Sequence, residues 1–363
     1  MVFIVGVDAH KRSHTLVVVD ATGRRCGEKT VDATDSGQQQ ALCWVRRKCA
    51  DADITWAIED VRSVTMRFEQ FLLAAGQKCV RVPTTLMART RHTTSRVPGK
   101  SDPIDALAAA RAYLREPNLP VSRHDPVSRE IKLLVDRRKV LVDQRTAAWT
   151  RILWRVHELD PERNPGALSA ARHRDPLRRW LMTQAGVTAE LALAELDDVE
   201  RFSQEANRLE RRIVRQVREI APTLMEVPGV GGLCAARIIG EAALVDRFPN
   251  EAAFARFAGV APAPRWSGAS AGQMRRARIG NREVNAALHR VALTQIRLTD
   301  SAGRAYYDKK IAEGHSTSMA LRCLKRRISR VVFLRLHADQ RQRLPKVGAP
   351  ETWGSHQPAE MQE

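Results

Sequence analysis

The chain has 363 residues, with 60 Lys or Arg against 41 Asp or Glu, and a formal net charge of +19. This excess favours a polyanionic partner, because basic side chains neutralise phosphates and release counterions, although a merely soluble basic protein is the alternative. The six cysteines form no Cys-x-x-Cys pair and no apolar run reaches the roughly 18 residues of a membrane span, which argues against a disulfide framework, a zinc site and a membrane partner.

The first 125 residues alternate between strand and helix patterns. Apolar runs bounded by turn residues predict strands over 3–8, 13–20, 24–31, 54–59 and 78–83. Helical spacing of apolar residues predicts helices over 38–50 and 64–75. A meander followed by alternating helices and strands is typical of an α/β fold with a mixed sheet.

Four carboxylates occupy the ends of these predicted elements. Asp8 and Glu59 each end a strand that we expect near the centre of the sheet, where α/β folds place their sites. Asp102, as a helix N-cap, and Asp105 share one side of a helix start, an arrangement that capping alone would explain. If all four converge, they would repel one another unless cations bind between them, and oxygen ligands suit Mg²⁺ or Mn²⁺. Two such ions can orient a phosphodiester exchange.

The surrounding residues make a family resemblance specific. The segments Val-Gly-Val-Asp8-Ala-His-Lys, Ala-Ile-Glu59 and Lys-Ser-Asp102-Pro-Ile-Asp105-Ala resemble the acidic tetrad of RuvC-like nucleases, which have the ribonuclease H fold. The Lys-x-Asp-x-x-Asp-Ala form resembles the DEDD transposases of the IS one-ten family of insertion sequences. The resemblance implies that all four acids are catalytic and bind the metal. Asp60 is the weaker candidate, since strand alternation directs it to the other face. We expect the basic segment 88–100 to contact nucleic acid, a solvated loop being the alternative.

The middle of the chain is predicted to be helical. Apolar residues recur at steps of three and four over 127–159 and again over 189–220. Two amphipathic helices of this length predict a helical hairpin or coiled-coil arm over 126–224, which could pair protomers or carry RNA. A pair of core helices is the alternative. The Arg-rich segment 167–186 between them gives no clear prediction.

The following segment carries a glycine-rich turn. Val-Pro-Gly229-Val-Gly231 precedes an apolar helix and resembles the hairpin of helix-hairpin-helix DNA-binding motifs. Glycines let the backbone approach a phosphate, and a helix N-terminus offers free N–H groups. We therefore predict that Gly229 and Gly231 contact nucleic acid, against the alternative of a plain turn between helices.

A serine-bearing segment, Trp266-Ser267-Gly268-Ala269-Ser270, lies among basic residues. By itself it could be a solvent loop. The order Phe-Ala-Gly-Val-Ala-Pro, Ser-Gly, Ile-Gly-Asn and then a helix resembles the C-terminal transposase domain of the same family. In that family the Ser of the Ser-Gly pair is the nucleophile, which implies Ser267, with Ser270 close enough to be confused with it. We expect the neighbouring arginines to bind nucleic acid; these are Arg265, Arg275, Arg276, Arg278 and Arg282.

Serine needs activation before it can attack a phosphate. His289, on the following helix, is a weak candidate for a base. The acidic tetrad with its metals is the stronger one, which would require the two catalytic domains, from different protomers, to meet in one site. The chain would then divide into a RuvC-like domain over 1–125, the arm over 126–224, a mainly helical serine transposase domain over 225–338 and a disordered tail over 339–363. The serine transposase domain would end with a last basic helix over 316–337.

The resemblance implies a site-specific DNA recombinase of an insertion sequence that works through a covalent phosphoserine. It also implies donor and target DNA, a structured guide (bridge) RNA from the element whose base pairing reads sequence, and a dimer that assembles into a tetramer in the bacterial cytoplasm, at the nucleoid. Two other functions stay open: a metal-dependent junction-resolving nuclease in which Ser267 is structural, and a non-catalytic nucleic-acid-binding protein.

Overall fold

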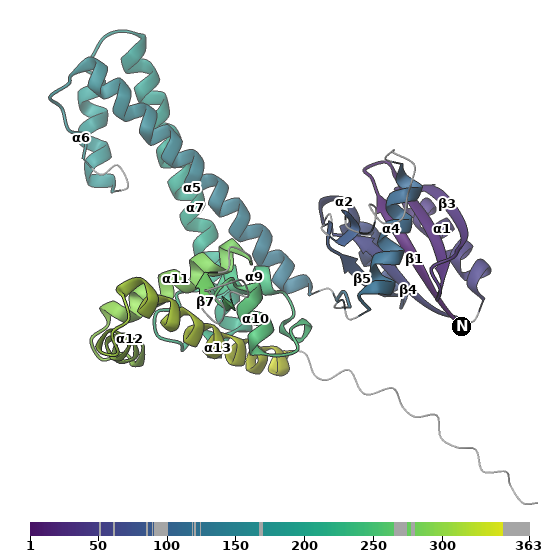
Figure 1. Cartoon of the computed structure of the whole chain (residues 1–363). Coiled ribbons are helices and arrows are strands. Elements are labelled where there is room, and N and C mark those ends of the chain that lie inside the picture. Colours follow the sequence, from purple (N-terminus) through teal and green to yellow (C-terminus); the bar gives the residue numbers. More distant parts are fainter. Residues whose placement is uncertain are drawn as a thin grey trace, which may run out of the picture. The chain divides into compact units, whose positions relative to one another are not determined.

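The computed structural model describes residues 1–50, 52–60, 62–84, 86–88, 90, 101–117, 119, 121–123, 125–166, 170–264, 274–276 and 280–343. The chain forms two compact units, Met1–His124 and Asp125–Glu363 (Figure 1). None of the described helices combines the length and the apolar character that crossing a membrane requires.

The first unit is built on a five-stranded sheet. Its strands are β1 (Val2–Ala9), β2 (Ser13–Asp20), β3 (Arg25–Asp32), β4 (Asp53–Glu59) and β5 (Lys78–Val82), in the spatial order β3-β2-β1-β4-β5. The first three strands pair antiparallel, whereas β4 pairs parallel with both β1 and β5. The predicted mixed sheet is therefore confirmed, and it is consistent with a RuvC-like domain.

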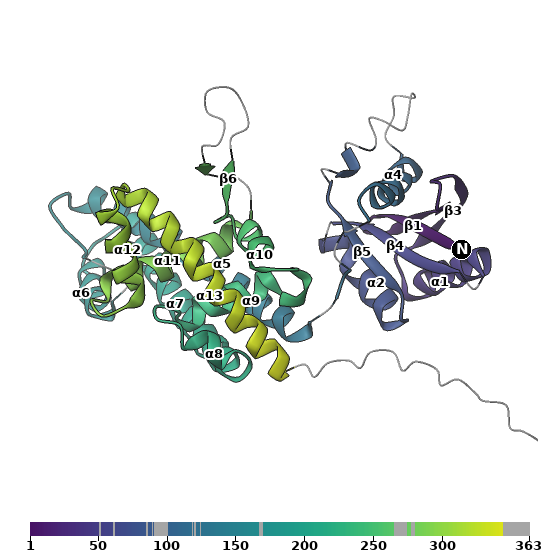
Figure 2. The same cartoon turned by 60° about the horizontal axis from the view of Figure 1, so that its bottom comes forward.

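Helices cover both faces of this sheet (Figure 2). Helices α1 (Asp35–Cys49) and α2 (Arg62–Ala74) bury one face, which Val5 and Val7 of β1 enter. Helix α4 (Asp102–Arg115) buries the other face, which Ile4 enters together with Ala57 of β4. Successive strand residues alternate between the two layers, as a pleated strand requires.

Helix α4 lies unusually close to β1 at Gly6. A Cβ atom added there would lie 1.8 Å from the carbonyl oxygen of Ala106 and 2.9 Å from the amide nitrogen of Ala110, both in the backbone of α4. Only glycine permits this approach. The alanines of α4 serve the same purpose, because short side chains let the helix axis come near the sheet. The close contact places the start of α4 over the end of β1.

The second unit begins with two long helices, α5 (Pro126–Leu159) and α7 (Val187–Ile220), which pack along each other. At one end they enclose a separate small core with α6 (Ala171–Leu181). This helix lies in the Arg-rich segment 167–186, for which we made no clear prediction. At the other end, Ile131 and Ile213 belong to the same apolar core as the C-terminal helices. Ion pairs such as Arg151–Glu195 and Arg137–Glu205 join the two helices along their exposed sides.

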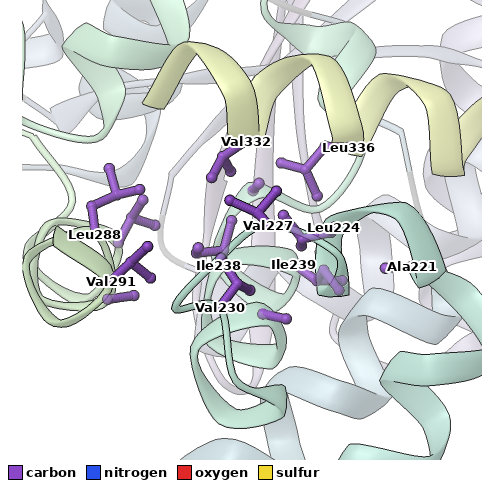
Figure 3. Close-up of a cluster of buried hydrophobic side chains, with 14 of the residues drawn as sticks. Ala221, Leu224, Val227, Val230, Ile238, Ile239, Leu288, Val291, Val332 and Leu336 are labelled. Carbon is purple, nitrogen blue, oxygen red and sulfur yellow. The ribbon is translucent and has the colours of Figure 1, made fainter. Parts of the chain in front are cut away.

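The C-terminal helices surround one apolar core (Figure 3). They are α8 (Pro222–Met225), α9 (Gly232–Ala242), α10 (Glu251–Phe257), α11 (Arg282–Arg297), α12 (Ala302–Ala312) and α13 (Thr317–Arg343), with a 3-10 turn η1 (Val245–Arg247). Figure 3 shows Ile238 of α9, Leu288 of α11 and Val332 of α13 gathered in this core. Two short strands, β6 (Pro262–Pro264) and β7 (Met274–Arg276), pair antiparallel beside it.

The last helix extends further than the sequence predicts. We expected a disordered tail from residue 339, but α13 continues to Arg343. The Asp339 carboxylate accepts hydrogen bonds from the backbone N–H groups of Thr223 and Leu224, each at 3.0 Å. Gln340 accepts another from the N–H of Val245, at 2.6 Å. These polar residues are buried because they satisfy backbone donors of neighbouring elements, so a tail from 339 was wrong; residues 344–363 lie outside the described residues.

Candidate active site

Asp8 lies one residue before the end of β1, and Glu59 ends the adjacent parallel strand β4. Val7 is in register with Ile58, so Asp8 and Glu59 follow at the same edge of the sheet. Asp8 shares the strand face of Ile4 and Gly6, and Glu59 shares that of Ala57, which is the face covered by α4. The Asp8 side chain is only 5% exposed, and Glu59 is half-buried.

The other two acids come from the first turn of α4. Asp105 is buried and Asp102 is half-exposed. We expected Asp102 to be the N-cap, but the N-cap is Ser101 and Asp102 is the first helical residue. Because Asp102 does not occupy the capping position, helix capping does not account for it. Asp60, which follows Glu59, is exposed, and its backbone N–H donates to the carbonyl of Val82 at the sheet edge.

The negative charges of two other acids act on Asp8. Burial raises the pKa of Asp8, and the negative charges of Asp105 and Asp102 raise it further, while His10 opposes the shift. Ionisation of a buried carboxylate beside two others costs free energy unless a cation lies among them. A divalent ion would remove this penalty, so the donors present fit a metal.

His10 belongs to this cluster, although we did not single it out. Its Nε2 atom lies 3.1 Å from Oδ2 of Asp8 and 3.4 Å from Oδ1 of Asp102. The ligand atoms of the three residues lie within 4.8 Å of one another. The only signal in the sequence was the position of His10 two residues after Asp8, at the start of the turn between β1 and β2.

The serine segment itself falls among residues that the structure does not describe. Ser267, Ser270, Arg265 and Arg278 lie outside the described residues, whereas Arg275 and Arg276 lie in β7. Pro264 is in register with Met274, so the chain enters and leaves 265–273 at adjacent points of the β6–β7 ribbon.

The chain after this segment is held by a polar network. Asn281 donates from its backbone N–H to the carbonyl of Phe257 at 2.6 Å and from Nδ2 to Oε2 of Glu241 at 2.7 Å. The Asn281 side-chain oxygen also caps α11. Glu241, of α9, is only 11% exposed and pairs through Oε1 with Nζ of Lys132, of α5, at 2.5 Å. Sequence reasoning missed Glu241 and Lys132, because their partners are remote in sequence.

The turn at Gly280 and Asn281, just before α11, is also sterically constrained. Gly280 has a φ of +109°, and a Cβ added there would lie 2.5 Å from the backbone nitrogen of Gly259. The turn therefore packs directly on the end of α10, and it fixes where α11 begins. Arg282, the first residue of α11, is exposed at this point.

The two glycines of the predicted phosphate-binding turn differ in their surroundings. Gly229 has a φ of +82°, and a Cβ there would lie 3.0 Å from the carbonyl oxygen of Val291, so conformation and packing already require glycine. Gly231 is the N-cap residue of α9, and a Cβ there would meet no described atom within 4 Å. The space at Gly231 leaves the start of α9 accessible. That Gly231 contacts nucleic acid stays a prediction.

Two family models match the chain in the order that the motifs suggest. The DEDD transposase model of IS110 elements matches residues 5–158, and the model described as the transposase IS116/IS110/IS902 family matches residues 221–308. The first match covers the strands and the α4 helix that carry the acidic cluster. The second covers α9, the Asn281 turn and α11.

Two proteins of known insertion elements align with nearly the whole chain, and a third aligns with about a third of it. The 42 kDa protein of insertion element IS900 from Mycobacterium paratuberculosis is 28% identical, over 92% of this chain and 96% of its own. The 44.8 kDa protein of IS116 from Streptomyces clavuligerus is 24% identical, over 89% and 92%. The 43.6 kDa protein of IS110 from Streptomyces coelicolor is 33% identical, over 33% and 30%. With both family models matched in order, this chain belongs to the IS110 (one-ten) family of DNA transposases, whose DEDD domain depends on divalent metal.

Proposed function

We propose that this transposase is a site-specific recombinase of an insertion sequence, in which Ser267 attacks DNA and Asp8, Glu59, Asp102 and Asp105 bind Mg²⁺. The observation that carries the proposal is the gathering of carboxylates where α4 crosses the end of β1. Asp8 is buried there and feels the charges of both Asp102 and Asp105. Glu59 ends the neighbouring strand on the same face.

Each group has a distinct part in the proposed reaction. The Ser267 hydroxyl loses its proton and its oxygen bonds to the scissile phosphorus, while the bond from phosphorus to one deoxyribose oxygen breaks and that oxygen takes up a proton to become a free DNA hydroxyl. That hydroxyl, or its counterpart from another strand, later attacks the phosphoserine and releases Ser267. The phosphodiester energy is kept in the intermediate, so no ATP is consumed. Bound Mg²⁺ would polarise the phosphate oxygens, and the four carboxylates would hold it in place.

The nucleic-acid contacts are part of the same proposal. Arginines bind phosphates bidentately, and those proposed for donor and target DNA are Arg265, Arg275, Arg276, Arg278 and Arg282. The turn at Gly229 and Gly231 would add backbone N–H contacts at the start of α9. We further propose a guide RNA encoded by the element, and a dimer that pairs into a tetramer to exchange strands between two duplexes. Because the substrate is DNA, we expect the reaction in the bacterial cytoplasm, at the nucleoid.

A covalent-adduct assay tests the proposal. Wild type, Ser267→Ala, Ser270→Ala and Asp102→Ala would be incubated with cognate DNA, element RNA and Mg²⁺, and denaturing gels would detect protein–DNA adducts. We expect adducts from wild type and Ser270→Ala only, and none when RNA or Mg²⁺ is omitted. Free-ended cleavage products without adducts would establish a hydrolytic nuclease instead. Adducts from Ser267→Ala but not from Ser270→Ala would move the nucleophile to Ser270.

A further inference from the structure

His10 lies in the acidic cluster but has no part in the proposed tetrad. We propose that His10 is a direct ligand of the divalent ion, binding through Nε2 beside Asp8 and Asp102. The centre would then have a mixed nitrogen and oxygen donor set. This inference rests on the metal-binding part of the proposed function.

The distances suit ligands around one ion. Two neighbouring ligands at right angles around an octahedral ion, with bonds of 2.0–2.1 Å, lie about 3.0 Å apart. The Nε2 atom of His10 lies 3.1 Å from Oδ2 of Asp8 and 3.4 Å from Oδ1 of Asp102. Two of the three distances between donor atoms are therefore close to those of neighbouring ligands around one ion, and all three atoms lie within 4.8 Å of one another. Small side-chain rotations would bring each donor atom within bonding distance of a single ion.

Burial leaves such an ion accessible from one side. Asp8 is almost fully buried, whereas the side chains of His10 and Asp102 are 47% and 50% exposed. The buried Asp8 carboxylate would bind the ion from the protein interior, and His10 and Asp102 would bind it near the solvent. Coordination positions toward solvent stay open, as a catalytic metal that accepts phosphate oxygens requires.

The backbone holds His10 in place without help from an ion. Ala9 is in register with His14, and the N–H of His10 donates to the carbonyl of Ser13 at 2.8 Å, which closes a tight turn between β1 and β2. The carbonyl of Arg12, in the same turn, accepts from the N–H of Ala33 at 2.8 Å. The turn is thus tied to the end of β3, and His10 is presented to the cluster by a fixed backbone.

A nitrogen ligand changes which ions bind best. Mg²⁺ prefers oxygen donors, whereas imidazole favours Co²⁺ and later transition ions, and Mn²⁺ accepts both. Removing His10 should therefore weaken Mn²⁺ and Co²⁺ binding more than Mg²⁺ binding. The competing explanation is that the imidazole N–H only donates a hydrogen bond to the two carboxylates and never contacts the ion.

Pulsed electron paramagnetic resonance of the full-length protein with Mn²⁺ separates these explanations, because directly bound imidazole nitrogen modulates the Mn²⁺ echo. We expect nitrogen modulation in wild type and its loss in His10→Gln, with Mn²⁺ affinity at least about tenfold lower. His315→Gln, which alters another exposed histidine beside a carboxylate, Glu313, is the matched control and should change neither. Asp8→Asn should abolish the bound signal and so assign it to this cluster.

The outcomes distinguish the two proposals. Bound Mn²⁺ that Asp8→Asn removes, but that shows no nitrogen modulation in wild type, would overturn His10 as a ligand and leave the proposed acidic metal site intact. No bound Mn²⁺ in folded wild type would overturn both. Circular dichroism of each variant checks that the fold is unchanged, as expected for His10→Gln at a half-exposed position.

Discussion

The packing of α4 against β1 at Gly6 offers a direct test of what positions the acids. In Gly6→Ala, the new Cβ would lie 1.8 Å from the Ala106 carbonyl oxygen, and real Cβ atoms essentially never come within 3.0 Å of a heavy atom outside their own residue and its two chain neighbours. The obstacle is backbone, which cannot rotate away, so α4 must move by about 1.2 Å relative to β1. Overpacking of this kind destabilises a fold by about 1–3 kcal/mol.

The same movement would carry Asp102 and Asp105 away from Asp8. A misplacement of about 1 Å in a catalytic constellation can lower a rate by about 100-fold. We therefore expect Gly6→Ala to lose about two orders of magnitude in DNA cleavage rate while it remains folded. The assay is adduct formation with cognate DNA at a temperature well below the unfolding midpoint of the variant, with thermal unfolding measured alongside.

Val17→Ala provides the matched control. Val17 is fully buried on the face covered by α4, and its truncation should cost about 2 kcal/mol through lost burial without moving the helix backbone. Equal unfolding midpoints with a much slower Gly6→Ala would support the argument. If the two variants cleave DNA at the same rate, the packing of α4 on β1 does not set the geometry of the acids.

Three further predictions concern other parts of the chain. Glu241→Gln should lower the free energy of unfolding by about 1–3 kcal/mol, because Lys132 loses the more buried of its two carboxylate partners and keeps only Asp136. It should also slow adduct formation by loosening the Asn281 turn. Asp143→Asn, in an exposed pair, should change stability by no more than about 1 kcal/mol and the rate by no more than about twofold. A chain ending at residue 338 should have a free energy of unfolding several kcal/mol lower than one ending at 343, because it lacks the contacts of Asp339, Gln340 and Arg343. Its midpoint of denaturant unfolding should therefore be lower, and equal midpoints would show that these contacts contribute nothing. Burial lowers the pKa of His14 below its ordinary value of 6.5. As the pH drops below 6.5, the unfolded chain takes up a proton that the folded chain excludes, so the stability present above pH 6.5 should fall. Thermal unfolding of His14→Phe, which keeps the stack on Phe68, should lack this pH dependence, and identical pH profiles of the two proteins would refute the argument.

Much of the candidate site could be predicted from local sequence. Asp8 and Glu59 were identified because each ends an apolar strand, and the parallel pairing of β1 with β4 puts both at one sheet edge. The Asp102 and Asp105 pair was identified from its spacing and from the family resemblance. The N-cap assignment was wrong by one residue, because a Ser-Asp-Pro sequence offers two residues able to cap and local propensity does not choose between them.

The strands, the helices, the basic charge and the order of the motifs could be predicted without a structure, because they depend on composition and on residues near one another in the chain. Three other features became visible only once the chain was folded: His10 lies beside both Asp8 and Asp102, Gly6 allows α4 to approach β1, and Glu241 joins Lys132 to Asn281. The tertiary structure also decided that polar Asp339 and Gln340 are buried in a helix rather than part of a tail. Each of these depends on a partner far away in sequence, and a hydrogen bond or a steric contact with such a partner leaves no periodic pattern along the chain.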